Sequence, residues 1–302
     1  MKILLTGATG FTGAPFAALA RAAGHDVVAL TGDLADKAGL RRQVLDAAPD
    51  WVVHLAAISF VGQADDNAFY AVNVVGTMNL LEALASLPQV PRRVLLASSA
   101  NVYGNCDASP IGEEQAPAPM NHYAMSKLAM EHMARTYAER LPLLVTRPFN
   151  YTGEGQALQF LVPKLVSHFA RRASVIELGN LHVEREFNDV NMVCEAYLKL
   201  LEHGEAGETY NICSGKAHTL RHLVDVLSKL TDHQLEVKVN PAFVRRGEVH
   251  RLCGSDAKLR GLLAAHGATI THPPLEDTLG RMLAQMTGAA GRSGLAGESG
   301  AR

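Results

Sequence analysis

A tyrosine and a lysine four positions apart, Tyr123 and Lys127, are the residues whose types and spacing fit acid–base chemistry. On a helix, positions i and i+4 lie one turn apart on the same face. A fixed ammonium beside a phenol favours the phenolate, so Lys127 is expected to lower the pKa of Tyr123 towards that of a working acid or base. The hydroxyl of Ser99, upstream of both, can then hold a substrate oxygen. The pair alone also occurs by chance on solvated helix faces, so the prediction depends on its surroundings.

Three glycines recur at every third position near the N-terminus, at Gly7, Gly10 and Gly13. They follow a short apolar run, residues 2–5, and precede an alanine-rich helical stretch, residues 14–23. In a strand–turn–helix of this kind, the first glycine permits the tight turn, the second lets the backbone approach a pyrophosphate, and the third allows close packing. The spacing is one residue longer than G-x-G-x-x-G, and it predicts a dinucleotide site.

An acidic residue, Asp33, stands about twenty residues beyond the last glycine, after the expected strand 26–30. An acid at this place binds the ribose 2′-hydroxyl of NAD and disfavours the 2′-phosphate of NADP. Lys37, Arg41 and Arg42 are close enough in sequence to tolerate a phosphate, and the short segment also allows Asp33 to meet the adenine ring. The sequence therefore predicts NAD(P)H and leaves the choice between NAD and NADP open.

Composition narrows the class of protein. The chain has 302 residues, of which 48% are hydrophobic and 19% charged, with a net charge of −2. Such a chain can bury a large core, and it offers no overall field for nucleic acid or an anionic membrane. The four cysteines form no C-x-x-C and the histidines no H-E-x-x-H, so we expect no metal site and a reducing compartment. The N-terminal apolar run is too short for a signal peptide, and we expect a cytoplasmic protein.

Apolar strands alternate with helices along the first half, which predicts an α/β fold with a Rossmann-like, doubly wound parallel sheet. Expected strands at 51–57 and 93–97 and expected helices at 64–86 and 122–140 place Gly7, Ala57 and Ser99 at carboxyl ends of strands. His54, inside its strand, is expected to be a core residue. We expect a dinucleotide-binding domain that comprises residues 1–150 and about 186–212. A smaller α/β C-terminal substrate-binding domain is expected at residues 151–185 and 213–286, and a disordered tail at residues 287–302.

Nearly the whole chain resembles the extended short-chain dehydrogenase/reductase family that acts on nucleotide sugars. The resemblance rests on Thr6-Gly7-Ala8-Thr9-Gly10-Phe11-Thr12-Gly13, His54-Leu55-Ala56-Ala57, Ser98-Ser99-Ala100-Asn101-Val102-Tyr103-Gly104, Tyr123-Ala124-Met125-Ser126-Lys127 and Arg147-Pro148-Phe149-Asn150. It implies that Tyr123 is the acid/base, that Ser99 takes the catalytic Ser/Thr position and that Lys127 binds the nicotinamide ribose. The cofactor contacts that we expect are Gly7, Gly10, Phe11, Thr12, Gly13, Asp33, Leu34, Leu55, Ala56, Ala57, Tyr123 and Lys127.

The second half carries the motifs Arg147-Pro148-Phe149-Asn150, Arg185-Glu186-Phe187-Asn188-Asp189-Val190, Tyr210-Asn211-Ile212-Cys213-Ser214-Gly215 and Arg245-Arg246-Gly247-Glu248. With these motifs it resembles the branch of the family that reduces GDP-4-keto-6-deoxy-D-mannose. The resemblance places Arg185 and Arg245 near phosphate, Glu248 on ribose and Asn150 beside the sugar or diphosphate, with Ser99 on the sugar oxygen. Cations suit the phosphates of a nucleotide-diphosphate sugar, here expected to carry GDP. Each arginine would equally suit a surface salt bridge.

Two positions separate the reaction types of the family. The 4,6-dehydratases have acidic residues directly after the catalytic Thr, where this chain has Ala100 and Asn101, so dehydration is not expected. Cys106 and His122 stand near the positions of an epimerase/reductase pair, but Cys106 is expected to be an ordinary thiol. The residues predict an NAD(P)H-dependent C4-ketone reductase. The alternative functions are a 4-epimerase with tightly bound NAD and a catalytically silent dinucleotide sensor.

The helices 64–86 and 122–140 resemble those through which the family dimerises, and a homodimer is expected.

Overall fold

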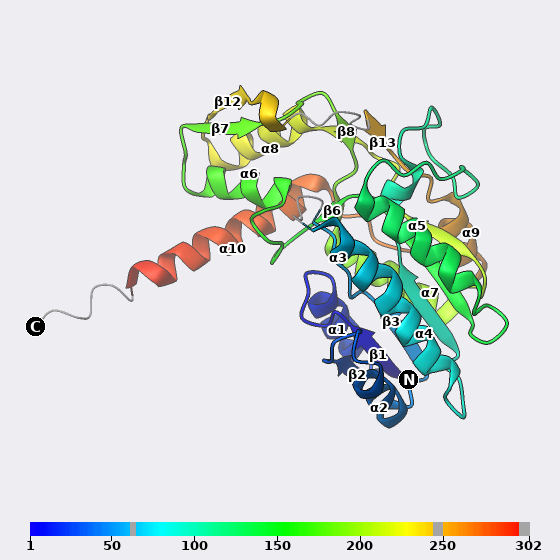
Figure 1. The fold of residues 1–302 in the computed structure, drawn as a ribbon. Coiled ribbons are helices and arrows are strands. Elements are labelled where there is room, and N and C mark those ends of the chain that lie inside the picture. Colours follow the sequence, from blue (N-terminus) through cyan, green and yellow to red (C-terminus); the bar gives the residue numbers. More distant parts are fainter. Residues whose placement is uncertain (61–64, 244–249, 296–302) are drawn as a thin grey trace, which may run out of the picture.

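A six-stranded, all-parallel sheet forms the centre of the larger part of the molecule in the computed structural model, which describes residues 1–60, 65–243 and 250–295 (Figure 1). Its strand order is β10-β5-β4-β3-β1-β2. The strands are β1 (Lys2–Thr6), β2 (Asp26–Leu30), β3 (Trp51–His54), β4 (Arg93–Ala97), β5 (Leu143–Pro148) and β10 (Thr209–Ile212). The order reverses between β1 and β3, which is where ligands of doubly wound sheets bind. The predicted α/β fold is confirmed.

Helices cover both faces of this sheet because its strands are apolar on both sides. One face packs against α1 (Gly13–Ala22), α7 (Val190–His203) and α9 (Ala257–Ala265). The other packs against α2 (Lys37–Ala47), α4 (Thr77–Ala85) and α5 (His122–Arg135). Neighbours in β1 divide between the faces: Ile3 and Leu5 lie in the first core, and Leu4 lies in the second.

The smaller part of the chain lies to one side of the sheet domain (Figure 1) and has an apolar core of its own. It joins α6 (Leu161–Ala170), α8 (Leu220–Thr231) and the start of α10 (Leu275–Leu295) to the parallel pair β7 (Val175–Leu178) and β12 (Glu236–Val239). Short strands connect this part to the larger one. They are β6 (Tyr151–Thr152), β8 (Glu184–Arg185), β9 (Asn188–Asp189), β11 (His218–Thr219) and β13 (Arg251–Leu252), with η3 (Pro241–Phe243) after β12.

Several predicted boundaries need correction. Helix α10 runs to Leu295, so residues 287–295 of the predicted disordered tail are helical, and residues 296–302 lie outside the described part of the chain. Helix α9 falls in the range assigned to the substrate-binding domain, but its Leu259 and Leu263 pack in the core of the large sheet. Helix α5 ends at Arg135, where single turns replace it, and not at residue 140.

The expected helix 64–86 contains a wider turn within its length. It begins as α3 (Asp66–Tyr70), continues as the π-helical segment η1 (Ala71–Gly76) and ends as α4. By length and composition the span Asp66–Ala85 is apolar enough to cross a membrane, with a mean hydropathy of 1.3, but half of it is buried inside the fold. The core that α4 shares with α2 and α5 accounts for its apolar composition.

Candidate active site

The side chains of Tyr123, Ser99 and Lys127 meet at the carboxyl end of β4. Helix α5 carries Tyr123 and Lys127 one turn apart, and the side chain of Asn121 caps its first turn by accepting a hydrogen bond from the Ala124 N–H at 2.9 Å. Ser99 lies just after β4, where its hydroxyl is close enough to the Tyr123 phenol to affect its pKa and accepts a hydrogen bond from the Asn101 N–H at 3.2 Å. The structure thus brings together the three residues that the sequence predicted to act as one group.

The electrostatics of this group differ from the expectation. The pKa of Tyr123 is raised to about 12, mainly by burial and to a smaller degree by the neighbouring Tyr151, while the Ser99 hydroxyl acts in the opposite direction. The prediction of a lowered pKa is therefore wrong for this arrangement, because desolvation of the phenolate outweighs the groups that favour it. A phenol with this pKa is protonated at neutral pH, which is the form of a general acid.

The ammonium of Lys127 is buried and anchored to the sheet. It donates a hydrogen bond to the Ala97 carbonyl at 2.8 Å. Burial lowers its pKa to about 8, and the carboxylate of Glu131, one turn further along α5, acts in the opposite direction. The helix therefore presents Tyr123, Lys127 and Glu131 in successive turns of one buried face.

A buried ion pair lies beneath this face. The guanidinium of Arg147, at the end of β5, donates to both carboxylate oxygens of Glu131, at 3.0 and 2.6 Å. The Ser98 hydroxyl donates to the same carboxylate at 2.5 Å, and the Arg147 guanidinium lies 4.9 Å from the centre of the Tyr103 ring. The Tyr103 hydroxyl continues the network to Asn211 of β10 at 2.7 Å. Because Ser98 directly precedes Ser99 in the chain, this network holds the end of β4, and with it Ser99, in place.

The glycine turn between β1 and α1 has the geometry that its sequence predicts. Gly7 has a φ of +68°, which favours glycine, and a Cβ there would lie 2.9 Å from the Ala56 nitrogen. A Cβ on Gly13 would lie 2.0 Å from the Gly7 carbonyl oxygen. Gly10 is exposed at the tip of the turn. Side chains at Gly7 or Gly13 would clash with this backbone, so the two glycines let the turn pack closely against the segment after β3 and against the start of α1. The turn thus forms a cradle of backbone at the N-terminus of α1, and such a place fits a dinucleotide diphosphate.

The remaining predicted cofactor residues lie around the same turn. Asp33 is exposed after β2, where its carboxylate accepts from the Ala35 N–H at 2.9 Å. Leu34 is buried, and its carbonyl accepts from the Asn79 side chain at 2.8 Å. The backbone N–H groups of Leu55 and Ala56 both donate to the Thr6 hydroxyl, at 3.1 and 3.0 Å. Ala57 follows at the same edge of the sheet.

His54 is a core residue, as the sequence predicted. Its Nδ1 lies 2.7 Å from the Thr6 hydroxyl and its Nε2 lies 2.8 Å from the Thr77 hydroxyl. Thr77 donates its proton to the Asn73 carbonyl, so Nε2 carries the proton and Nδ1 accepts from Thr6. Burial and, to a lesser degree, Lys127 lower the pKa of His54 to about 3. The imidazole is neutral and links β1 to η1.

Asn73 of η1 is a site residue that sequence reasoning missed. Its amide donates to the Ile58 carbonyl at 3.1 Å and to the Ser126 hydroxyl at 3.0 Å, and it accepts from the Ile58 N–H at 2.9 Å. Ser126 in turn donates to the Tyr123 carbonyl at 2.7 Å. Asn73 therefore joins the segment after β3 to the catalytic helix. A polar residue inside an otherwise apolar helical run was the available signal.

Besides Ser99, two predicted substrate residues lie in the described part of the chain: Asn150 directly before β6, and Arg185 in β8. Asn150 is exposed, and its carbonyl accepts from the Asn188 N–H at 2.9 Å. Arg185 donates to the carbonyls of Glu184 and His250, at 2.9 and 3.2 Å. Arg245 and Glu248 lie outside the described residues, so their predicted roles are untested.

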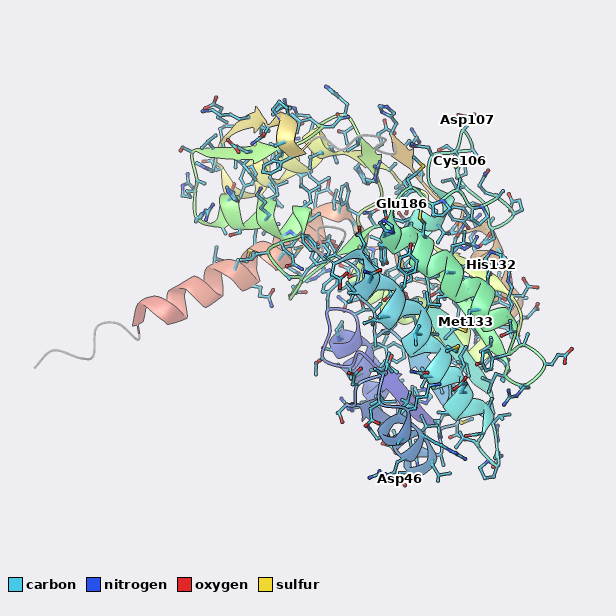
Figure 2. The ribbon with its side chains drawn as sticks, in the orientation of Figure 1. Asp46, Cys106, Asp107, His132, Met133 and Glu186 are labelled. Atoms are coloured by element: carbon cyan, nitrogen blue, oxygen red, sulfur yellow. The ribbon has the colours of Figure 1, made fainter. Side chains whose placement is uncertain are left out.

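A buried carboxylate, Glu186, organises these strands (Figure 2). It accepts hydrogen bonds from the backbone N–H groups of Gly254 and Ser214, both at 2.7 Å, and from the Asn188 side chain at 3.0 Å.

Cys106 lies in a separate loop after η2 (Ala100–Tyr103). Burial raises the pKa of its thiol, which is therefore neutral. Its Sγ donates to the Ala108 carbonyl at 3.8 Å. Both observations fit the interpretation of Cys106 as an ordinary thiol.

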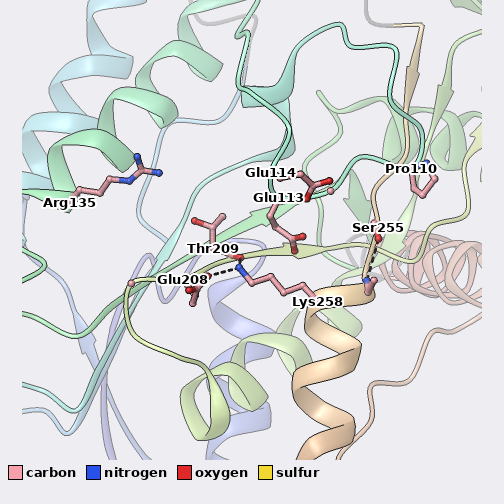
Figure 3. A pocket seen from close by; sticks show the side chains of 11 residues that line it. Pro110, Glu113, Glu114, Arg135, Glu208, Thr209, Ser255 and Lys258 are labelled. Atoms are coloured by element: carbon pink, nitrogen blue, oxygen red, sulfur yellow. Dashed lines mark hydrogen bonds and ion pairs between the residues drawn. The ribbon is translucent and has the colours of Figure 1, made fainter.

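A hollow of about 690 Å³ opens at the edge strand β10, away from these residues (Figure 3). Glu113 and Lys258 line it, and they satisfy the unpaired edge of the strand. Glu113 accepts from the Asn211 N–H at 2.8 Å, and Lys258 donates to the Thr209 carbonyl at 2.8 Å and to Glu208 at 2.6 Å. The charged groups of this hollow therefore protect a sheet edge.

Comparison with known proteins agrees with the fold. The family profile of GDP-mannose 4,6 dehydratase matches residues 27–264. A GDP-6-deoxy-D-talose 4-dehydrogenase of Aggregatibacter actinomycetemcomitans is 37% identical over 87% of this chain and 91% of its own length. A GDP-6-deoxy-D-mannose reductase of Pseudomonas aeruginosa is 38% identical over 85% of this chain and 89% of its own length.

Two solved structures have the same fold. RMD from Pseudomonas aeruginosa, complexed with NADPH, is 34% identical, with a TM-score of 0.87 over 95% of this chain and 99% of that one. A proposed epimerase from Burkholderia cenocepacia J2315 is 45% identical, with a TM-score of 0.89 over 95% of this chain and 98% of that one. The predicted family, enzyme class and NAD(P) cofactor are confirmed. The chain belongs to the extended short-chain dehydrogenase/reductase family, in the group described by GDP-mannose 4,6-dehydratase.

Proposed function

We propose that this chain reduces the C4 ketone of GDP-4-keto-6-deoxy-D-mannose with NAD(P)H. The observation that carries the proposal is the buried group of Tyr123, Ser99 and Lys127, in which the phenol is protonated at neutral pH. The names of two relatives point to the same substrate, since GDP-6-deoxy-D-mannose and GDP-6-deoxy-D-talose differ only in configuration at C4. Reduction of one 4-keto sugar from either face yields these two products.

The residues of the site have separate roles in this reaction. The reduced nicotinamide supplies the hydride. Tyr123 donates its proton to the oxygen that gains charge at C4, and Ser99 holds that oxygen by a hydrogen bond. Lys127, fixed by the Ala97 carbonyl, holds the ribose of the cofactor and supplies a positive charge beside the proton transfer. The cradle of Gly7, Gly10 and Gly13, with Phe11 and Thr12, holds the diphosphate at the N-terminus of α1.

The smaller part of the chain is the proposed sugar-nucleotide domain. Asn150 would contact the sugar or its diphosphate, Arg185 and Arg245 the phosphates, and Glu248 the ribose of GDP. Asn150 and Arg185 fit these roles because Asn150 directly precedes β6, Arg185 lies in β8, and these short strands connect the two parts of the chain. The dinucleotide-binding domain would be residues 1–150 with about 186–212, together with α9.

The surroundings of Ala100 and Asn101 favour reduction over the dehydratase reaction. Ala100 is 1% exposed and packs in an apolar cluster with Tyr103 and Phe149. Asn101 supplies a backbone N–H to Ser99. Neither side chain can abstract or donate the proton that elimination of water requires.

We also propose that the protein is a cytoplasmic homodimer. The outer faces of η1 and α5 expose Val75 at 46% and Met125 at 41%, and a second copy packed on them would bury both side chains. Sedimentation at increasing protein concentration would test this. A monomer at all concentrations would contradict it.

The first experiment is an assay of nicotinamide oxidation with NADPH or NADH and GDP-4-keto-6-deoxy-D-mannose, followed by NMR of the product. Stoichiometric oxidation supports the reductase, and the coupling between H3 and H4 identifies the product, because it is large for the manno and small for the talo configuration. Tightly bound NAD with no net oxidation favours the 4-epimerase, which the structure from Burkholderia cenocepacia J2315 keeps as a second candidate. Cofactor binding without any turnover favours a sensor.

Asp33 allows a prediction about cofactor choice. Its carboxylate is exposed at the end of β2, where it would face the 2′-position of the adenosine ribose. Asp33→Asn is expected to raise the ratio of kcat/KM for NADPH over NADH roughly fivefold, because it removes about 1 kcal/mol of repulsion in a solvated place. Steady-state rates with both cofactors measure the ratio. Asp46→Asn, on α2 at the far end of the domain (Figure 2), is the control. An unchanged ratio in Asp33→Asn would place its carboxylate away from the ribose.

Lys127 allows a prediction about pH. Because its pKa is lowered to about 8, kcat/KM for reduction is expected to fall as pH rises through this value. Tyr123, with a pKa of about 12, stays protonated in the same range. Between pH about 8 and the ordinary lysine value of 10.5, the unfolded chain binds more protons at this group than the folded one, so its contribution to stability rises with pH. The loss of activity should thus occur without unfolding. A profile of kcat/KM that stays flat up to the ordinary lysine pKa would contradict this assignment.

A further inference from the structure

Tyr151 contacts two residues of the glycine turn, although it lies far from them in the sequence. It lies in β6, directly after Asn150, and β6 pairs with β9. Its hydroxyl lies 2.8 Å from the Thr12 hydroxyl, and its ring stacks on Phe11 with centroids 5.7 Å apart and planes 12° from parallel. The segment that carries a predicted substrate residue is thus attached to the turn that carries the predicted cofactor contacts.

Thr12 has an unusual role for a residue of its type at the start of a helix. A threonine at the N-cap usually accepts a hydrogen bond from the second or third N–H of the helix. Here the third residue is Pro15, which has no N–H, and the Ala14 N–H already donates to the Gly10 carbonyl at 3.1 Å. The Thr12 hydroxyl instead pairs with Tyr151, while the Cys194 thiol of α7 donates to the Thr12 carbonyl at 3.6 Å.

The consequence is a helix start with backbone donors left for a ligand. Within the described part of the chain, no side chain caps α1, and the N–H groups of residues 11–13 have no acceptor. Such N–H groups favour a phosphate, and the direction in which they point depends on how the backbone at Phe11 and Thr12 is held. Tyr151 holds both side chains.

We propose that Tyr151 is a positioning residue that orients the turn at residues 11–13 towards a dinucleotide diphosphate. It couples this turn to the segment that begins at Asn150. The inference rests on dinucleotide binding and not on the identity of the sugar substrate. Its test therefore needs no sugar, and a failure of the proposed reductase activity would leave it standing.

The experiment is a double-mutant cycle of Kd values for NADPH and NADH, measured by calorimetry on the intact chain. Tyr151→Phe keeps the ring on Phe11 and removes the hydroxyl, and Thr12→Val removes its partner. Each single variant is expected to raise the Kd about fivefold, the size of one hydrogen bond. The double variant should weaken binding no more than either single one, because the two hydroxyls act through each other. Additive effects, or an unchanged Kd in Tyr151→Phe, would overturn the proposal.

A second ligand separates positioning from a general loss of structure. ADP-ribose contains the diphosphate, and adenosine contains no phosphate. Tyr151→Phe is expected to weaken the binding of ADP-ribose as it weakens that of NADPH, and to leave the binding of adenosine unchanged. Tyr137→Phe, which also removes a hydroxyl from a partly buried ring but lies beyond the end of α5, is the matched control for all three ligands. Equal weakening of ADP-ribose and adenosine would show that Tyr151 merely supports the fold and would overturn the proposal.

Discussion

Replacing Tyr123 with phenylalanine is expected to lower kcat for ketone reduction by about 10²- to 10⁴-fold, the usual contribution of a positioned general acid. The substitution removes one hydroxyl and keeps the ring, which is 9% exposed and lies against Phe69. Ser99 keeps its bond from the Asn101 N–H. The effect should therefore fall on kcat, with the Kd of the cofactor and the unfolding temperature close to those of the unchanged protein. Single-turnover oxidation of the nicotinamide measures it.

Two comparisons make this result specific. Tyr70→Phe removes a hydroxyl that lies 3.0 Å from His122 Nδ1 on the surface, and it should leave kcat unchanged. Ser99→Ala keeps Tyr123 but removes the second contact to the substrate oxygen, so its loss should be smaller than that of Tyr123→Phe. If Tyr123→Phe retained more than about a tenth of the activity, another group would have to supply the proton.

The sequence predicted well the features that depend on residue type at fixed spacing. The glycine turn, the shared face of Tyr123 and Lys127, and the neutral core position of His54 follow from local rules. Helix α2 was missed, although Leu40, Val44 and Ala47 lie on one face and Asp36 caps its first turn, accepting from the Gly39 N–H at 3.0 Å. The sequence therefore contains local signals for this helix.

Other features could not be predicted because they arise from contacts between distant segments. The strands β8 and β9 have two residues each and exist through pairing with β11, β13 and β6, so no periodicity precedes them. The raised pKa of Tyr123 depends on burial by the whole fold, which outweighs the neighbouring groups that the spacing suggests. Glu131 repeats the spacing of Tyr123 and Lys127, but its partner, Arg147, lies on another element.

That ion pair gives the largest expected effect on stability. The side chains of Arg147 and Glu131 are 4% and 1% exposed, and Glu131 also accepts from Ser98. Glu131→Ala is expected to lower the free energy of unfolding by about 3–5 kcal/mol, because it leaves a buried guanidinium without its counter-charge. Denaturant unfolding measures the loss. Glu82→Ala, which breaks the exposed pair with Lys37, should cost less than about 1 kcal/mol.

A second readout ties the same carboxylate to the active site. Glu131 raises the pKa of Lys127 against the effect of burial, so in Glu131→Ala the alkaline fall of kcat/KM is expected at lower pH than in the unchanged protein. Replacing both partners, as Glu131→Met with Arg147→Met, should restore part of the lost stability, since no unpaired charge remains. It should not restore the pH profile, because the carboxylate is still missing. If the double variant recovered both the free energy of unfolding and the pH profile of kcat/KM, Glu131 would act only through packing. If Glu131→Ala changed neither of these two quantities, the Arg147 guanidinium would have to reach water when its partner is removed.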